Sequence, residues 1–153
     1  MITSNTNLLF AGDFAPVGRY ENIALERANQ IFGDALELVS NADLSFINLE
    51  CPLTFADDGV RKDGPNLKAH PGIIESLQDF SVLGLANNHI MDFGSAGLRD
   101  TIVAVERAGL KSVGAGMNLH DASEPSVFEI RGKRIALLAI ADRELNQAST
   151  GTP

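Results

Sequence analysis

Asparagine, histidine and aspartate side chains gather where a short apolar segment of this sequence ends. Asn87, Asn88, His89 and Asp92 follow directly after the apolar run 81–86. Amide and carboxylate oxygens and imidazole nitrogens are ligands of hard or borderline divalent metals, and an imidazole also transfers protons near neutral pH. The types and spacing of these residues therefore indicate a site that binds metal, moves protons or does both.

Two earlier apolar segments end in residues of the same kind. Asp13 closes the run 7–13, and Asn48 and Glu50 close the run 43–50. Carboxylates from neighbouring strand ends can bridge two metal ions, and a histidine just beyond an asparagine ligand can hold or protonate a phosphate oxygen. The set matches that of a two-metal phosphoester hydrolase, with a divalent cofactor that is Mn²⁺, Mg²⁺, Fe²⁺ or Zn²⁺.

Taken singly, each of these residues also has an ordinary structural role open to it. The aspartates can cap a turn or a helix N-terminus, and the glutamate can lie at a solvated strand end. The asparagines can occupy turn positions, and the histidine can be a hydrogen-bonded structural residue. The functional interpretation is favoured because three separate strand ends carry such residues.

Alternating extended and helical patterns position these residues. The sequence predicts strands over three apolar runs, at 7–13, 43–50 and 81–87, and a short fourth strand followed by a turn at 111–116. It predicts helices between them, at 21–42 (with Gly33 as a weak point), 71–80 and 95–109. Two further extended runs within 126–141 are expected to form a hairpin around 131–133.

Strands that alternate with helices predict an α/β fold, a layered sandwich with a mostly parallel sheet and flanking helices. In such folds ligands bind beyond the carboxyl ends of the strands, which is where the polar residues fall. The segment 51–72, rich in Gly, Pro, Asp and Lys, reads as a long loop of the kind that is often functional, and in it Lys68 could meet an anion.

Composition excludes several classes of protein. The 153 residues fit one domain, and the formal net charge of −8 argues against nucleic acid as a partner. The single cysteine, Cys51, is expected to be a small buried side chain. No apolar run is long enough for a membrane span, and the first residues do not form a signal peptide, so the default expectation is a cytoplasmic location.

Four stretches carry a resemblance to a known family. The segments GDFAPVG, INLECPLT, LGLANNHIMDFGSAGLRDT and AGLKSVGAGMNLHDASEP, in this order, resemble the bacterial capsule-synthesis CapA family, also called the poly-γ-glutamate biosynthesis family. The resemblance covers about residues 8 to 141. That family is similar in fold to the calcineurin-like metallophosphoesterases, so the resemblance implies a layered α/β sandwich with a two-metal site.

The resemblance also implies residue roles. Asp13, Glu50 and Asn88 stand where the family has metal ligands, with Glu50 as the bridging carboxylate. His89 stands where a histidine supports the phosphate, and Asp92 would steady that histidine. His89 and Asp92 are therefore the expected catalytic residues, and Asp13, Glu50 and Asn88 the expected metal ligands.

Two departures from the family pattern bear on this site. The usual first motif, Asp-x-His, has Ala15 in place of its histidine. Family members also continue into a second half with further histidine motifs, whereas the three histidines here, His70, His89 and His120, stand in no such motif. Residues 1–153 are therefore expected to be the N-terminal portion of a single domain of this type, incomplete at its C-terminus and in its metal site.

Two functions from different classes remain open. One is a metal-dependent, phosphoesterase-like hydrolase associated with capsule or poly-γ-glutamate synthesis, acting on an anionic polymer or a phosphoester. The other is a non-catalytic accessory that binds polymer or partner proteins in a synthesis complex, because fold analogy does not establish turnover. An incomplete sandwich also leaves apolar faces uncovered, so a homo-oligomer is possible.

The hydrolase interpretation makes a geometric prediction. We expect Asp13, Glu50, Asn88 and His89 to converge at one end of one sheet, close enough to share a metal site or a pair of metals about 4 Å apart.

Overall fold

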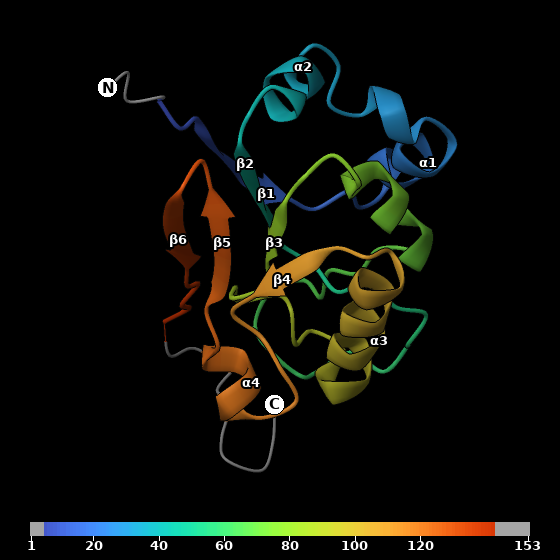
Figure 1. Ribbon diagram of the computed structural model, residues 1–153. Helices are drawn as coiled ribbons and strands as arrows, with labels where there is room; N and C mark the ends of the chain where they lie inside the picture. Colours follow the sequence, from blue (N-terminus) through green and yellow to red (C-terminus); the bar gives the residue numbers. More distant parts are fainter. Residues whose placement is uncertain (1–4, 143–153) are drawn as a thin grey trace.

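Four parallel strands form the central sheet of the computed structural model, which describes residues 5–142 (Figure 1). The strands are β1 (Leu8–Phe14), β2 (Leu44–Leu49), β3 (Val82–Gly84) and β4 (Lys111–Val113). Their order in the sheet is β1-β2-β3-β4, and each neighbouring pair is parallel. All four carboxyl ends therefore meet at one edge of the sheet.

Helices cover one face of this sheet and a hairpin lies on the other, with the short helix at 119–123 next to the hairpin (Figure 1). The helices are α1 (Arg19–Glu26), η1 (Ala28–Gln30), α2 (Ala35–Ser40), η2 (Pro71–Leu77), α3 (Gly94–Arg107) and α4 (Leu119–Ser123), with η1 and η2 of the 3₁₀ type. The hairpin consists of β5 (Ser126–Ile130) and β6 (Lys133–Leu137), which pair in antiparallel fashion. The predicted layered α/β class is thus confirmed.

Alternation along the strands divides the core into two parts. Ile47 and Leu49 of β2 point into the larger cluster, where they join Leu98 and Val105 of α3. Leu44, at the start of the same strand, belongs instead to the smaller cluster beneath the hairpin. Ile47 and Leu49 are two positions apart and share a face, whereas Leu44 lies three positions before Ile47 and points to the opposite face, as alternation along a strand requires.

The predicted strands, the helix at 95–109 and the hairpin are confirmed, with β3 ending earlier than expected, at Gly84. The helix predicted at 71–80 is the shorter 3₁₀ helix η2, which ends at Leu77. The prediction of one helix over 21–42 is wrong, because this segment is divided among α1, η1 and α2. Gly33, with a φ of +51°, adopts the left-handed conformation, and Arg27, with a φ of −137°, leaves the helical region. The helical spacing of apolar residues continues through both positions, but the helical backbone conformation is interrupted at each of them.

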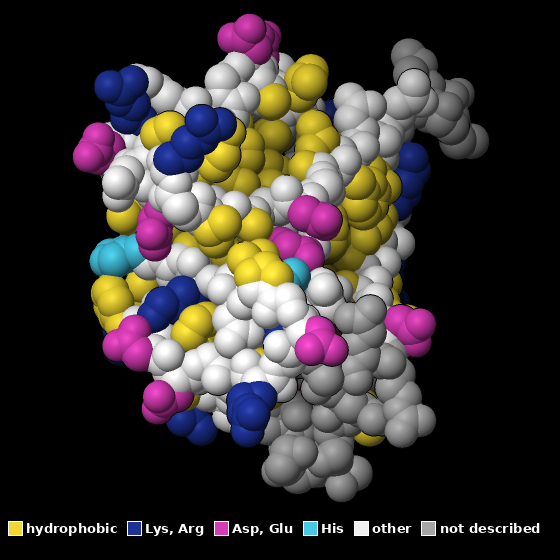
Figure 2. Space-filling view, turned by 180° about the vertical axis from the view of Figure 1, so that it is seen from behind, with side chains coloured by type: hydrophobic (Ala, Val, Ile, Leu, Met, Phe, Trp, Pro, Cys, Tyr) yellow, Lys and Arg dark blue, Asp and Glu magenta, His cyan; other side chains and the backbone are white. Residues whose placement is uncertain are grey.

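Several apolar side chains of the described residues are open to solvent. Leu8 and Phe10 lie on β1, an edge strand, and Phe10 is 60% exposed although its ring lies 5.7 Å from that of Phe46. Figure 2 shows apolar patches of this kind beside acidic groups on the face opposite to that of Figure 1. A homo-oligomer stays a prediction, and within residues 5–142 no helix has the length and apolar character to cross a membrane.

One buried hydroxyl anchors the loop 51–72 to α3. Thr101 is fully buried. Its Oγ1 accepts a hydrogen bond from the Leu53 N–H at 2.9 Å and donates one to the Gly97 carbonyl at 2.7 Å. Leu53 also pairs with Ala69 in an isolated parallel bridge, which brings the two ends of the loop together. The loop therefore leaves and rejoins the core at fixed points.

We expect Thr101→Val to lower the free energy of unfolding by about 1–3 kcal/mol, because it leaves the buried Leu53 N–H without an acceptor while keeping the side-chain volume. Urea unfolding measures this change. Thr101→Ser keeps the hydroxyl and removes only a methyl group, so it reports the packing part separately. A Val variant as stable as the parent would show that this hydrogen bond does not hold the loop.

Candidate functional site

The ends of β1 and β2 bring two carboxylates to one amide. The side-chain nitrogen of Asn48 donates a hydrogen bond to Asp13 Oδ1 at 2.8 Å and another to Glu50 Oε2. Asp13 and Asn48 also lie opposite one another in the parallel ladder. The two predicted carboxylate ligands are therefore neighbours at the same edge of the sheet.

A bulge in β1 explains why Asp13 reaches this position. The register shifts between Phe10 and Asp13, so Ala11 and Gly12 together stand opposite the one residue between Phe46 and Asn48. Regular alternation would have put Asp13 on the helix-covered face with Ala11, which packs against the larger core cluster. An extra residue in a strand re-aims the side chains that follow it.

The environment of Glu50 disfavours its charged form. Partial burial, and then the negative charge of Asp13, raise the pKa of Glu50 above its ordinary value, while the hydrogen bond from Asn48 and the proximity of His89 oppose this rise. Neither carboxylate forms an ion pair with a basic side chain within residues 5–142. This pair would be stabilised by a cation placed between or beside the two groups.

Asn87 joins this carboxylate pair to the turn that follows β3. Its Nδ2 donates to Asn48 Oδ1 at 3.1 Å and to the Leu49 carbonyl at 2.8 Å. Its Oδ1 accepts the backbone N–H groups of His89 and Ile90 at 3.0 and 2.8 Å. One buried amide thus links the ends of β2 and β3 and sets the backbone on which His89 stands.

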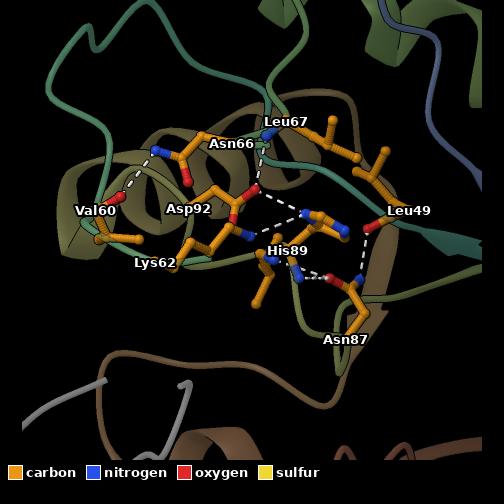
Figure 3. Close-up of polar contacts among 9 residues, drawn as sticks. Leu49, Val60, Lys62, Asn66, Leu67, Asn87, His89 and Asp92 are labelled. Atoms are coloured by element: carbon orange, nitrogen blue, oxygen red, sulfur yellow. Dashed lines mark hydrogen bonds and ion pairs between the residues drawn. The ribbon is translucent and has the colours of Figure 1, made fainter. Parts of the chain in front are cut away.

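His89 and Asp92 form a pair that a lysine completes (Figure 3). His89 Nδ1 lies 2.7 Å from Asp92 Oδ2, and Lys62 forms an ion pair with Asp92 Oδ1. The N–H of Leu67 donates to Asp92 Oδ2 at 2.7 Å. Asp92 is 1% exposed and accepts from donors in the loop 51–72 as well as from His89.

These contacts assign a tautomer to the imidazole. A carboxylate paired with an ammonium group accepts hydrogen bonds and donates none, so His89 Nδ1 carries the proton that points at Asp92. The Lys62 ammonium, 3.2 Å from the same nitrogen, then donates to Asp92 Oδ1 and not to the ring. The second ring nitrogen, Nε2, is then free to accept a proton or a hydrogen bond when the ring is neutral. Figure 3 shows this nitrogen directed away from Asp92, toward the side on which Leu49 and Asn87 lie.

The donors available in this stretch fit only part of a metal site. Asp13 and Glu50 supply oxygen ligands of the type that hard divalent cations take, and Asn88 is exposed beside the same turn. Within residues 5–142, however, no three His, Cys, Asp or Glu side chains are grouped so as to hold a metal ion. The described residues thus offer a carboxylate pair rather than a full coordination shell.

The structure relates the predicted site residues to one another as follows. Asp13 and Glu50 share the amide of Asn48, and His89 contacts Asp92. Asn88 is exposed, and it is Asn87 that contacts Asn48. The metal and catalytic roles of Asp13, Glu50, Asn88, His89 and Asp92 stay predictions.

The structure also bears on three other expectations from the sequence. The N-cap of α3 is Phe93 and receives no side-chain hydrogen bond, so Asp92 is not a helix cap. Cys51 is buried as predicted, and burial raises the pKa of its thiol to about 12. The ammonium of Lys68 is engaged by Asp57 and by the Ala56 carbonyl.

Lys62 is the residue of this site that sequence reasoning missed. It lies in the charged stretch 61–63, where neighbouring arginine and aspartate give it no distinguishing mark. Its partners stand 27 and 30 positions further along the chain. A buried partner was needed for Asp92, but the sequence contained no signal that selected Lys62 from the other cations.

Comparison with known proteins gives a consistent group of relatives. The family model described as "Bacterial capsule synthesis protein PGA_cap" matches residues 7–153. "Capsule biosynthesis protein CapA" of Bacillus anthracis is 32% identical over 133 residues, 82% of this chain and 32% of the relative. "PGA biosynthesis protein CapA" of Bacillus subtilis is 32% identical over 139 residues, 87% of this chain and 36% of the relative.

A third relative has a different name. The "Probable polyglutamine synthesis accessory protein" of Mycobacterium tuberculosis is 33% identical over 126 residues, which are 80% of this chain and 32% of the relative. The chain thus spans about a third of the length of these curated relatives.

Glu50→Gln should change how the stability of the metal-free chain depends on pH. Because the pKa of Glu50 is raised above 4.5, its contribution is fully present below about pH 4.5 and is lost as the pH rises through the folded-state pKa. The variant lacks this loss, since glutamine carries no charge. Its stability relative to the parent should therefore rise with pH in this window.

Urea unfolding in the presence of a chelator, at a series of pH values from about 4 upward, checks this expectation. Glu129→Gln, on the exposed side of β5, is the matched control for loss of one charge. Parallel pH curves for the parent and Glu50→Gln would contradict it.

Proposed function

This chain belongs to the bacterial capsule synthesis protein family PGA_cap, and on that premise we propose that it provides part of a metal-dependent hydrolase that acts on a phosphoester or an anionic polymer of the cell envelope. The names of the two Bacillus relatives refer to capsule and PGA biosynthesis, which supports the association with polymer synthesis. The longer relatives leave room for further ligands outside the stretch described, so the proposal concerns the whole protein.

The observation that carries this proposal is the carboxylate pair beside an oriented histidine. Asp13 and Glu50 come from adjacent strand ends, accept from one nitrogen and lack a neutralising cation within residues 5–142. Two neighbouring carboxylates repel each other, and this repulsion costs free energy. Carboxylates with a purely structural role are therefore not expected to lie side by side. A carboxylate pair that a cation would stabilise is the arrangement expected of a divalent-metal site without its metal.

Each side chain then has a defined task. Asp13 and Glu50 would hold the metal, which when bound polarises the phosphoryl group and supplies a nucleophile at neutral pH. Asn88, exposed after β3, would add a neutral oxygen ligand. His89, with Nδ1 committed to Asp92, would use Nε2 to hold or protonate an oxygen of the substrate.

A non-catalytic accessory is the second candidate, and a specific observation favours it. The mycobacterial relative is named an accessory protein, and the grouped donors within residues 5–142 do not complete a metal site. In that case the same edge of the sheet would bind polymer or a partner protein through its polar side chains. Metal content of the full-length protein discriminates between the two candidates.

We expect Glu50→Gln and His89→Asn to separate metal binding from turnover in the full-length protein. Glu50→Gln should reduce metal content sharply, because it removes a carboxylate that neutralises the cation. His89→Asn should retain the metal but reduce the turnover of an aryl phosphoester about a hundredfold. Loss of one preorganised group typically raises the activation barrier by about 3 kcal/mol, which corresponds to that factor. Elemental analysis and a phosphatase assay measure the two quantities.

The opposite pattern would point to structural roles. Glu50→Gln would then leave metal content unchanged, and His89→Asn would lower the melting temperature only. A parent protein without bound metal, or two variants that bind metal like the parent, would overturn the hydrolase proposal in favour of the accessory.

A further inference from the structure

Lys62 places a buried ammonium group next to the histidine of the candidate site. Its side chain is 6% exposed, that of its partner Asp92 is 1% exposed, and its Nζ lies 3.2 Å from His89 Nδ1. The lysine comes from the loop 51–72, whereas Asp92 and His89 follow β3. This contact therefore joins two segments that are remote in sequence.

The loop wraps around Asp92 through several independent contacts. The Val60 N–H donates to the Asp92 carbonyl at 2.8 Å, and the Leu67 N–H donates to Oδ2 at 2.7 Å. Asn66 closes the loop on itself by donating to the Val60 carbonyl at 2.9 Å (Figure 3). The backbone of the loop is thus already held at Asp92 without the lysine.

Stability alone gives a poor reason for burying this ion pair. Two charges taken out of water lose their solvation, and buried pairs often contribute no more to stability than apolar residues of similar volume. The loop has other anchors as well, at Thr101 and at the Leu53–Ala69 bridge. Only the ion pair determines which oxygen of Asp92 is available to the histidine. Lys62 donates to Oδ1, so that Oδ2 accepts from His89 and Leu67.

We propose that Lys62 is a positioning residue for His89: its ammonium fixes the Asp92 carboxylate so that Oδ2 accepts the Nδ1 proton and Nε2 is presented to the substrate. The plane of the carboxylate is fixed by donors on both of its oxygens, Lys62 on one side and the Leu67 N–H on the other. Without the lysine, Oδ1 is a buried acceptor with no partner, and rotation of the carboxylate would satisfy it at the expense of His89. The catalytic consequence rests on the proposed function, whereas the orientation of the ring does not.

The ring itself gives a readout that a purely structural role would not move. Long-range ¹H–¹⁵N correlation spectra at fixed pH distinguish imidazoles protonated at Nδ1 from those protonated at Nε2, and His89→Asn identifies the signals of His89. The parent should show the Nδ1–H form. Lys62→Met should shift His89 toward a mixture of both forms, and Lys62→Arg, which keeps the cation, should restore the parent pattern.

The same variants in the full-length protein test the catalytic consequence. Lys62→Met should lower kcat for an aryl phosphoester by about tenfold or more through loss of orientation, with KM and metal content within about twofold of the parent. Lys68→Met is the matched control, because Lys68 lies in the same loop and pairs with Asp57 at the surface. It should leave the His89 spectrum and kcat unchanged.

A second variant covers the case in which Lys62→Met does not fold. Lys62→Gln keeps Asp92 and much of the side-chain length but removes the cation, and it should also weaken the Nδ1–H preference. A folded Met variant, or the Gln variant, with the parent tautomer would overturn the proposal. A parent without phosphoesterase activity would overturn only the proposed function, since the spectra of His89 still decide the role of Lys62.

Discussion

The hydrogen bond between the amides of Asn87 and Asn48 is the interaction on which the rest of this site depends. On one side, Asn48 gathers the carboxylates of Asp13 and Glu50 with its nitrogen. On the other, Asn87 fixes the turn that carries His89 by accepting two backbone N–H groups. Asparagine suits both positions because its side chain donates and accepts at once. Two amides therefore hold the two chemically different halves of the site in contact.

These halves differ in how far their charges are compensated. Asp92 is buried beside an ammonium group, a backbone N–H and an imidazole, so groups of the protein neutralise its charge and donate to its oxygens. Asp13 and Glu50 share one amide donor, and partial burial, followed by the negative charge of Asp13, raises the pKa of Glu50. The histidine half is thus complete within the described chain, whereas the carboxylate half retains a deficit of positive charge. A ligand of positive charge is the partner that this asymmetry favours.

Sequence reasoning identified those parts of the site that follow from local pattern. Apolar runs ending in polar residues located the strand ends, and a parallel α/β fold brings such ends to one edge, so the positions of Asp13, Glu50 and His89 could be expected there, whereas their roles stay predictions. The helix predicted over 21–42 failed because Gly33 and Arg27 interrupt the backbone where the apolar spacing does not. Lys62 could not be predicted from the sequence, because its contact is with Asp92, 30 positions further along the chain, and the loop that carries it has no periodic pattern. The bulge that re-aims Asp13 is likewise a property of pairing between strands, which no single strand reveals.

The order of the strands in the sheet has a consequence for how the chain acquires its structure. Because each strand pairs with the one that precedes it, a chain emerging from the ribosome can add β2 to β1, β3 to β2 and β4 to β3 in the order of synthesis. No strand has to wait for a partner from the far end of the chain, so the entropy lost in closing each connection stays moderate. The carboxylate pair forms once β2 has docked, and the histidine joins it only when the turn after β3 arrives. The strand order therefore permits the site to be assembled in the order of synthesis, from its anionic half to its imidazole.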